Sequence, residues 1–333
     1  MSWLRDALRQ LPGPDTVSAE RLRARADDIL RPTGALARLD DVAVHMAAWQ
    51  RTSTPRVERP AALVFAGDHG VAEHGEVSAY PTAVTAAMLA ACRQGKATIC
   101  ALARSVGATL EAIDVGVGRP TCDIRFEPAM SPQRFEDVVD QAVAAVDALD
   151  TDLLVLGEIG IGNTTAAAAL AGALLGDDPA TWVGRGTGVD DAGLERKRAA
   201  VAAVMERTAG IDDPIEIMRE AGGAELAAIA AATIAARKRS ICVVLDGYVV
   251  TSAVLPLHIA APGVLDHCIV GHCSAEPGHR KVLDAICKPV LLDLGMRLGE
   301  GSGAMVAVPI IRAACDAVVD VATFAEWFGQ DAG

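Results

Sequence analysis

Two carboxylates stand beside glycines, in settings that would leave them free to act on a ligand. Glu158 follows directly on an apolar run, and Glu300 lies between Gly299 and Gly301. Glycines on either side let the backbone come close to a ligand and leave the acid little packing of its own. A carboxylate in that position can remove a proton, so Glu300 is predicted to be a general base.

The residues around Glu158 form a glycine-rich loop. Residues 152–171 run from an apolar stretch through several glycines into an Ala-rich stretch, an order that predicts strand, loop and helix. The free N–H groups and the positive dipole end of such a helix favour a phosphate or a phosphorylated sugar. A tight turn capped by Thr164 and Thr165 is the alternative, because the stretch is neither a Walker A motif nor a complete GxGxxG.

A second glycine loop, residues 184–191, precedes a predicted helix that contains Lys197. The formal net charge of the chain is -13, which argues against nucleic acid and anionic membranes as partners. In so acidic a chain, a lysine that follows a glycine loop is a candidate counter-charge for phosphate. The alternative is an ordinary lysine on a solvated helix face.

Two clusters contain histidine. Asp68 and His69 follow an apolar run, where they could contact a ligand, form an acid–base pair or make a capped turn with Asp68 as the N-cap. His272, Cys273 and His279 are possible zinc ligands, but their spacing fits no familiar metal motif. No metal is therefore predicted.

These candidates must be positioned by a parallel sheet. Six short apolar runs end at a glycine or an aspartate, and helical patterns occur between them: residues 61–66, 111–115, 152–156, 241–245, 268–270 and 290–292. Continuous apolar strands that alternate with helices predict an α/β fold whose mostly parallel sheet is covered on both faces. Ligands bind beyond the carboxyl ends of such strands, which is where the polar clusters fall.

The remaining features predict an ordinary soluble protein. Residues 15–50 have helical spacing with a turn at 31–34, and the proline-containing stretch 52–60 is a predicted linker. The eight cysteines form no CxxC pair, and those in apolar surroundings are interpreted as buried thiols. The N-terminus lacks an apolar signal core and no long uninterrupted apolar segment follows, so a cytoplasmic location is expected.

Together these stretches closely resemble the nicotinate-nucleotide–dimethylbenzimidazole phosphoribosyltransferase family, whose members make the lower-ligand nucleotide of cobalamin. The resemblance covers nearly the whole chain. The motifs that carry it, in order, are residues 31–36, 67–71, 77–81, 157–165, 184–190, 246–247, 271–279 and 294–304.

The resemblance implies transfer of ribose 5-phosphate from nicotinate mononucleotide to 5,6-dimethylbenzimidazole, giving α-ribazole 5′-phosphate and nicotinate. It implies that Glu300 is the general base and that Glu158 is a second catalytic carboxylate. The nucleotide and phosphate contacts that it implies are Gly160, Gly162, Asn163, Thr164, Gly186, Lys197 and Ser274. The residues beside the base pocket are Ser78, Ala79, Tyr80 and Leu298.

The resemblance also implies a Rossmann-like large domain (residues 59–312), a small helical domain from both chain ends (1–58 with about 313–333) and a homodimer. The reaction is expected to need no cofactor and no metal. The preferred base stays open among dimethylbenzimidazole, other benzimidazoles, adenine and phenols. A nucleotide sensor without catalysis, and a metal-dependent hydrolase built on Asp68, His69, His272 and His279, are the alternatives.

Overall fold

The computed structural model of the chain describes residues 3–73 and 77–329, and its centre is a parallel sheet. Within these residues the sheet has six strands in the order β2-β1-β3-β4-β5-β6. The strands are β1 (Pro60–Gly67), β2 (Thr109–Gly116), β3 (Leu153–Ile159), β4 (Cys242–Leu245), β5 (Cys268–His272) and β6 (Val290–Leu292). Each coincides with a predicted apolar run, and the predicted α/β fold is confirmed.

The winding direction of the sheet reverses between β1 and β3. From β1 the chain crosses to β2 on one side, and the later strands extend the sheet on the other side. A crevice opens at the carboxyl ends of neighbouring strands where the winding direction reverses in this way. Glu158 is paired with Phe65 at that end of the sheet.

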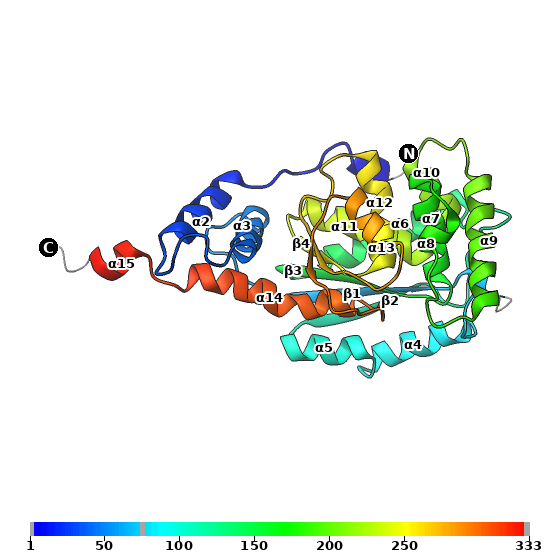
Figure 1. The fold of residues 1–333 in the computed structure, drawn as a ribbon, viewed down its shortest axis with the longest axis horizontal. Coiled ribbons are helices and arrows are strands. Elements are labelled where there is room, and N and C mark those ends of the chain that lie inside the picture. Colours follow the sequence, from blue (N-terminus) through cyan, green and yellow to red (C-terminus); the bar gives the residue numbers. More distant parts are fainter. Residues whose placement is uncertain (1–2, 74–76, 330–333) are drawn as a thin grey trace.

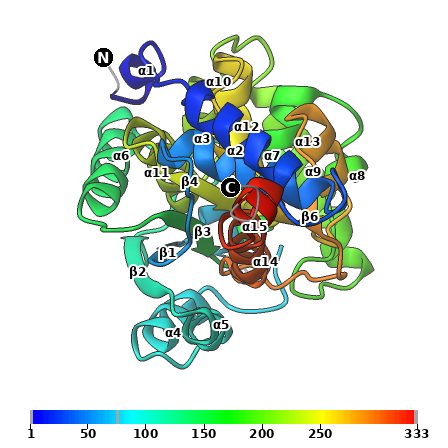
Figure 2. The ribbon, with the colours of Figure 1, turned by 90° about the vertical axis from the view of Figure 1, so that its left-hand side faces the viewer.

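Helices cover both faces of the sheet (Figure 1). Those that pack into the larger core are α1 (Trp3–Ala7), α6 (Pro132–Asp147), α7 (Asn163–Leu175), α8 (Pro179–Trp182), α9 (Asp191–Arg207), α10 (Pro214–Ala221), α11 (Ala224–Lys238), α12 (Tyr248–Ala260) and α13 (His279–Ala285). Those that pack into the second core are α2 (Thr16–Asp28), α3 (Arg38–Gln50), α4 (Ala83–Arg93), α5 (Thr98–Val106) and α14 (Ser302–Val319). A 3₁₀ turn, η1 (Gly70–Ala72), follows β1, and α15 (Phe324–Phe328) ends the described chain. Figure 2 shows α4 and α5 together on the side of the sheet opposite α6 and α11.

Side-chain caps fix where several helices begin. Asp15 caps α2, and Ser131 caps α6 with Pro132 at its first helical position. Asp190 accepts a hydrogen bond from Gly193 N–H and caps the start of α9. Such caps satisfy N–H groups that have no partner inside the helix.

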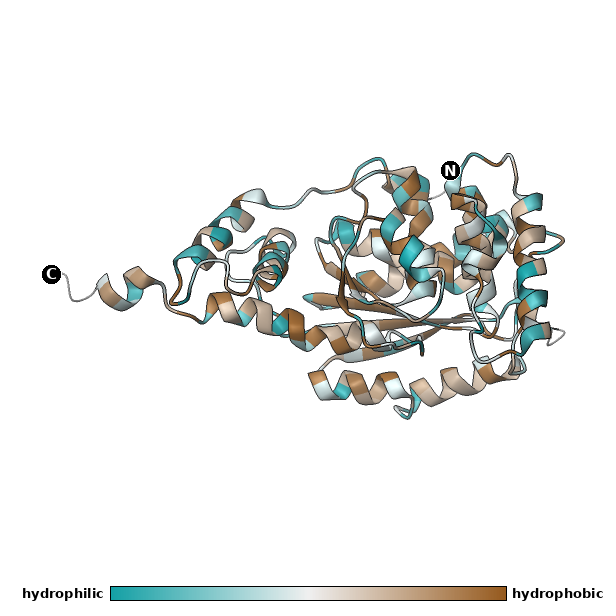
Figure 3. Ribbon diagram, viewed as in Figure 1, coloured by the Kyte–Doolittle hydropathy of each residue, from teal (hydrophilic) through white to brown (hydrophobic). Residues whose placement is uncertain are grey.

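Helix α11 is buried on all sides. Its Ala-rich sequence lets it pack closely between the sheet and the helices α6 and α12. A helix that is apolar all round belongs in a core, whereas the outer α9 carries the hydrophilic residues seen in Figure 3. The first turn of α11 nevertheless contains Glu225, which has no exposed surface.

The helices near the chain ends pack against two different parts of the fold. Helices α2 and α3 pack against α14, and Ile29 forms an isolated bridge with Thr323. Helix α1 instead packs with α6 and α11, and its residues Leu4 and Ala7 belong to the larger core. The two-domain division of residues 1–58 with 313–333 and residues 59–312 stays a prediction, and residues 1–2 and 330–333 lie outside the described chain.

Helix α14 is the one described helix that is long and apolar enough, by length and composition, to cross a membrane. Of its 18 residues, 56% are buried inside the fold, where the helix packs against β5, α3 and α5. Arg312 on this helix donates to the carbonyl oxygens of Val57 and Val106. These contacts make α14 a core helix of the sheet's second face.

Candidate active site

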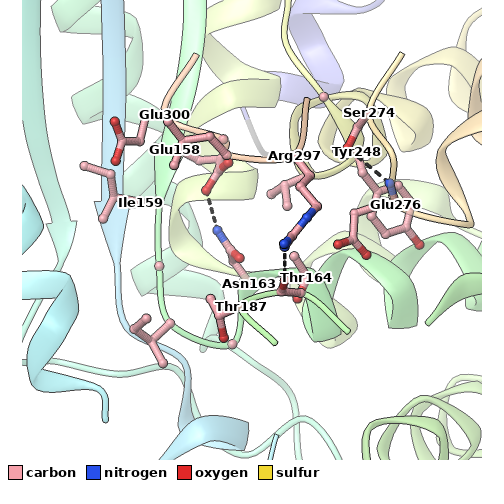
Figure 4. Close-up of a pocket in the computed structure, with 18 of the residues that line it drawn as sticks. Glu158, Ile159, Asn163, Thr164, Thr187, Tyr248, Ser274, Glu276, Arg297 and Glu300 are labelled. Carbon is pink, nitrogen blue, oxygen red and sulfur yellow. Dashed lines mark hydrogen bonds between the residues drawn. The ribbon is translucent and has the colours of Figure 1, made fainter. Parts of the chain in front are cut away.

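A cavity of about 280 Å³ opens at the carboxyl ends of β3, β4 and β5 (Figure 4). The charged side chains and most of the other polar side chains that line it come from segments far apart in the sequence. These are Glu158, Asn163 and Thr164; Thr187 and Lys197; Asp246, His272, Ser274 and Glu276; and Arg297 and Glu300. Strand ends and helix starts therefore supply the polar groups, as the topology predicts.

Glu158 ends β3 as a buried acid. Its side chain accepts a hydrogen bond from the amide of Asn163 in the first turn of α7 (Figure 4). Burial raises the pKa of Glu158 well above its ordinary value, and the charges of Asp246, Glu225 and Glu300 raise it further. The Asn163 hydrogen bond opposes these effects only in part, so the pKa of Glu158 stays raised.

Glu300 is held in a left-handed backbone conformation, with a φ of 63°. Few residues other than glycine adopt this conformation, and such strain concentrates at functional sites. Gly157 on β3 lets the Glu300 backbone come close, because a Cβ at Gly157 would overlap the carbonyl oxygen of Glu300. Strand β3 and the Glu300 loop thus pack backbone against backbone.

The carboxylate of Glu300 lies at the start of α5. Ile99 N–H lies 3.5 Å from Oε2 of Glu300, near the positive end of the helix dipole. Burial raises the pKa of Glu300, the Ile99 N–H opposes that rise, and the charge of Asp246 adds to it. A carboxyl group with a raised pKa is better matched to proton transfer near neutral pH.

Asp246 ties the Glu300 loop to the sheet. It follows β4 and accepts hydrogen bonds from Gly301 N–H at 3.2 Å and Ala304 N–H at 2.8 Å. Its Oδ1 also lies 3.3 Å from Nε2 of His272. The start of α14, and with it Glu300, is therefore fixed by a carboxylate from a neighbouring strand.

The opposite end of the cavity is built for an anion. Lys197 is 1% exposed, and its ammonium group donates to Thr164 Oγ1 at 3.1 Å and to the carbonyl oxygen of Gly184 at 2.8 Å. Burial lowers the pKa of Lys197 to about 8, partly offset by the charge of Glu276. The lysine therefore lies inside the protein, and the alternative of a solvated helix face is wrong.

The glycine loops complete this end. Helix α7 begins after Gly162, which has a φ of 96° and supplies no side-chain cap, so its first turn faces the cavity with backbone groups. Arg297 donates to the carbonyl oxygen of Gly186 at 3.0 Å and joins the second glycine loop to the Glu300 segment. A cation, backbone N–H groups and hydroxyls in this arrangement suit a phosphate.

The rim of the cavity is apolar and partly exposed. Tyr80 is 52% and Leu298 55% exposed. The hydroxyl of Thr187 lies 3.4 Å from both Ser78 Oγ and the backbone nitrogen of Ala79. A flat ring could therefore enter between this rim and Glu300.

The structure gathers the predicted catalytic, nucleotide-binding and base-binding residues into this one cavity. All of them except Ala79 line it, and Ala79 contacts the lining residue Thr187. The sequence assigned no role to Asp246, Thr187 or Arg297. Asp246 carries the same signal as Glu158, an acid at the end of an apolar run, whereas the two loop residues carry none.

The histidine clusters have structural partners. His69 is paired with Glu225, and Asp68 accepts from Gly118 N–H, so the alternative in which Asp68 acts as an N-cap is wrong. Nδ1 of His279 accepts from Ser274 N–H, and burial lowers the pKa of His279 to about 3. Among the residues described, no three His, Cys, Asp or Glu side chains gather as metal ligands, which leaves the hydrolase alternative without a centre.

An anion cradle, two carboxylates and an apolar rim on a parallel sheet define an enzyme that acts on a small phosphorylated substrate. A family model described as phosphoribosyltransferase matches residues 11–327. The chain belongs to this phosphoribosyltransferase family.

Individual relatives agree with the family model. The chain is 46% identical over 323 residues to a protein of Roseobacter denitrificans, covering 97% of this chain and 95% of the relative. It is 47% identical over 324 residues to one of Mesorhizobium japonicum, covering 97% and 96%. Both relatives are named nicotinate-nucleotide–dimethylbenzimidazole phosphoribosyltransferase.

A solved structure matches the fold over the same length. The crystal structure of CobT from Thermus thermophilus superimposes with a TM-score of 0.89 at 40% identity, covering 95% of this chain and 100% of that one. Similarity in fold, length and sequence thus points to one family.

Proposed function

We propose that this chain transfers ribose 5-phosphate from nicotinate mononucleotide to 5,6-dimethylbenzimidazole, yielding α-ribazole 5′-phosphate and nicotinate. The observation that carries the proposal is a single cavity with Lys197 at one end and the carboxylates Glu158 and Glu300 at the other. The names of the relatives support the choice of substrates.

In the proposed complex the phosphate binds at the cationic end of the cavity. Lys197 supplies the counter-charge, and Gly186, Thr164 and Ser274 supply hydrogen-bonding groups beside it. The ribose then lies over the loop that contains Gly160, Gly162 and Asn163, next to Glu158. The acceptor base enters between Ser78, Ala79, Tyr80 and Leu298 on the rim and Glu300.

The proposed reaction is a single displacement at C1′ of the ribose. The unprotonated ring nitrogen of the benzimidazole forms a bond to C1′ while the bond from C1′ to the pyridinium nitrogen breaks. Nicotinate leaves with that electron pair and is neutral at its nitrogen, so its departure needs no general acid. Attack from the opposite face inverts C1′ and converts a β-nucleotide into an α-product.

Glu300 acts as the general base in this proposal. The benzimidazole N–H proton passes to the carboxylate of Glu300 as the second ring nitrogen attacks, which prevents a cationic product. Such assistance contributes roughly 10²–10⁴-fold to a rate. The Ile99 N–H and the strained backbone hold the carboxylate in one position, which fits a group that must meet a ring at a fixed angle.

Glu158 stabilises the charge that develops on the ribose. As the pyridinium leaves, C1′ and the ring oxygen become electron-poor, and a buried carboxylate beside them acts more strongly than one in water. The three acidic neighbours that raise the pKa of Glu158 make it more receptive to this cation.

The test is a direct assay. Purified protein mixed with nicotinate mononucleotide and dimethylbenzimidazole should release nicotinate and form α-ribazole 5′-phosphate, measured by chromatography. A panel of other benzimidazoles, adenine and phenols then identifies the preferred base. Nucleotide binding without nicotinate release from any base would overturn the proposal and favour a sensor.

The general base can be tested separately with Glu300→Gln. The amide retains the shape of the side chain but cannot take the proton, so kcat should fall about 10²–10⁴-fold while nucleotide affinity changes little. Calorimetric titration with nicotinate mononucleotide provides the affinity. A variant with wild-type kcat would remove Glu300 from this role.

We also propose that the protein is a cytoplasmic homodimer. The aromatic side chains of Phe324, Trp327 and Phe328 on α15 are 44%, 63% and 62% exposed, which suits a surface covered by a second copy. Sedimentation velocity provides the mass in solution, and a monomer at micromolar concentration would contradict the dimer.

A further inference from the structure

A histidine–carboxylate pair lies directly behind the glycine loop of the candidate site. Nε2 of His69 lies 2.5 Å from Oε1 of Glu225, and both side chains have 0% exposure. His69 follows β1, and Glu225 lies in the first turn of α11, where the helix dipole favours a carboxylate. Neither belongs to the described residues that line the cavity, so the pair does not itself touch a substrate.

The pair occupies the space in which side chains of the loop would lie. A Cβ at Gly160 would come within 3.1 Å of Nε2 of His69 and 3.2 Å of Oε1 of Glu225. A Cβ at Gly162 would lie 3.4 Å from the Cβ of His69, and one at Gly223 would overlap its Cε1. The glycine loop therefore packs against His69 at Gly160 and Gly162, alongside the carbonyl oxygen of Gly67 and the Cβ of Ala72.

The pair is incompletely satisfied. In the described structure Nδ1 of His69 and Oε2 of Glu225 have no hydrogen-bond partner, although both are buried. Because Nδ1 has no acceptor, the ring proton belongs on Nε2, where it is donated to Glu225. A buried group with a missing partner costs stability, and a fold retains such a cost where it serves a function.

We propose that His69 and Glu225 are positioning residues for the phosphoribosyl transfer. They hold the backbone of residues 160–162, and through it Glu158 and Asn163, in the geometry that the ribose requires. This inference rests on the proposed function, and it assigns a role to two buried residues that do not reach the substrate.

The charges around the pair define its electrostatic effect. Glu158 faces Glu225 from α11, Asp246 from the end of β4 and Glu300 from the loop before α14. Glu225 also acts on Arg134 of α6 and pairs with His69. The negative charge of Glu225 is one cause of the raised pKa of Glu158, so its removal should let Glu158 ionise at lower pH.

Two substitutions of His69 test whether its side chain must be long enough to donate a hydrogen bond to Glu225. The amide nitrogen of His69→Gln lies near the place of Nε2 and can still donate to Glu225, whereas His69→Asn is too short. We expect His69→Gln to retain kcat within about tenfold and His69→Asn to lose about 10²-fold, with a smaller change in KM, because small displacements of catalytic groups are costly. Equal kcat values for the two folded variants would overturn the proposal.

Glu225→Gln tests the charge. Its amide oxygen can still accept from His69, so kcat at its optimum should remain within about tenfold, while the acid limb of the kcat profile moves to lower pH. The matched control is Thr233→Val on the same helix, which removes a buried hydroxyl bonded to Ile229 and should leave the pH profile unchanged. An acid limb that does not move in Glu225→Gln would contradict the inferred effect of the Glu225 charge on the ionisation of Glu158.

A measurement without substrate keeps the inference independent of the reaction. Amide hydrogen exchange over residues 157–165 should be faster in His69→Asn than in wild type or His69→Gln, while exchange in α11 stays unchanged. Unaltered exchange in this loop would overturn the positioning role. Absence of nicotinate release by wild type would instead reject the proposed function. The exchange result would still show whether His69 and Glu225 hold the loop in place.

Discussion

At the scale of single residues, the site contains carboxylates that are buried close together. This arrangement serves the reaction but lowers the stability of the folded protein. Glu158, Asp246 and Glu300 lie at one end of a cavity, where the charges of Asp246 and Glu300 raise the pKa of Glu158 and the charge of Asp246 raises the pKa of Glu300. Removal of one negative charge should therefore make the folded protein more stable and the reaction slower.

Glu158→Gln should be more heat-stable than wild type above neutral pH. The pKa of Glu158 is raised in the folded state, so the native protein binds the proton more tightly than the unfolded chain, and stability falls as pH rises through that interval. Glutamine can still accept from Asn163, and we expect Tm at pH 8 to rise by about 2–4 °C, with little difference at pH 4. Scanning calorimetry at both pH values checks this, and a lower Tm at pH 8 would contradict it.

Lys197 should make nucleotide binding sensitive to alkali. With its pKa lowered to about 8, the lysine loses its charge as pH rises from 7 to 9, and affinity for nicotinate mononucleotide should fall over that range. In Lys197→Met the affinity should already be roughly 10–100-fold weaker at pH 7 and independent of pH, because a charge-assisted bond is lost.

The neighbouring Arg198→Met is the control, because Arg198 pairs with Glu195 on the same helix. Calorimetric titrations at four pH values compare the proteins. An affinity of wild type that stays constant up to pH 9 would show that Lys197 does not titrate there.

At the scale of elements, the site depends on the contact between β3 and the loop that precedes α14. Gly157 on β3 lies against the backbone of Glu300, so a side chain at one element would displace the proposed base on the other. The position of Glu300 relative to β3 is therefore set by direct contact between two backbones.

Gly157→Ala should reduce kcat by about 10²-fold or more and lower Tm, because its Cβ has no room beside the Glu300 carbonyl. Gly13→Ala is the control, since a Cβ at Gly13 meets no atom within 4 Å. Steady-state kinetics and thermal unfolding check both variants. Full activity in Gly157→Ala would mean that the two backbones separate easily.

The elements were largely predictable from the sequence because most strands are short apolar runs. A strand covered on both faces has few polar positions, which makes β1 and β3 easy to find, whereas the edge strand β2 contains Glu111 and Asp114. Glu158 and Glu300 were found for the same reason, since each is an acid among glycines or apolar residues. Arg297 and Thr187 were missed because nothing in a loop sequence indicates which way a side chain points.

Two residues show more clearly what could not be predicted from the sequence. The alternatives for Asp68 included a helix cap, but its carboxylate accepts from Gly118 on a loop 50 residues away. The alternatives for His69 included ligand contact, whereas its partner Glu225 lies 156 residues further along the chain. Pairings over such separations depend on the folded topology, which no local pattern encodes.

At the scale of the whole molecule, α14 joins the candidate site to the helices at the chain ends. Its first turn is fixed by Asp246, and its other end lies near α2 and α15. Arg25 of α2 donates to the carbonyl oxygens of Val318 and Val321 and pairs with Glu326.

Arg25→Ala should loosen these terminal helices without affecting the chemistry. It removes several hydrogen bonds around the end of α14, so Tm should fall by a few degrees, about 1–2 kcal/mol of unfolding free energy, while kcat stays within about twofold. Thermal unfolding and the nicotinate-release assay check the two parts. A large loss of kcat at full stability would show that the terminal helices act on the site.

The order of residues in the cavity also has a consequence for synthesis. The loop with Glu158 and Asn163 is translated well before Glu300 and α14, which complete the second core. Until those later segments are made, the nascent chain has only part of the nucleotide site, and the second core lacks α14. The complete cavity is therefore expected to form only after α14 has packed against the sheet.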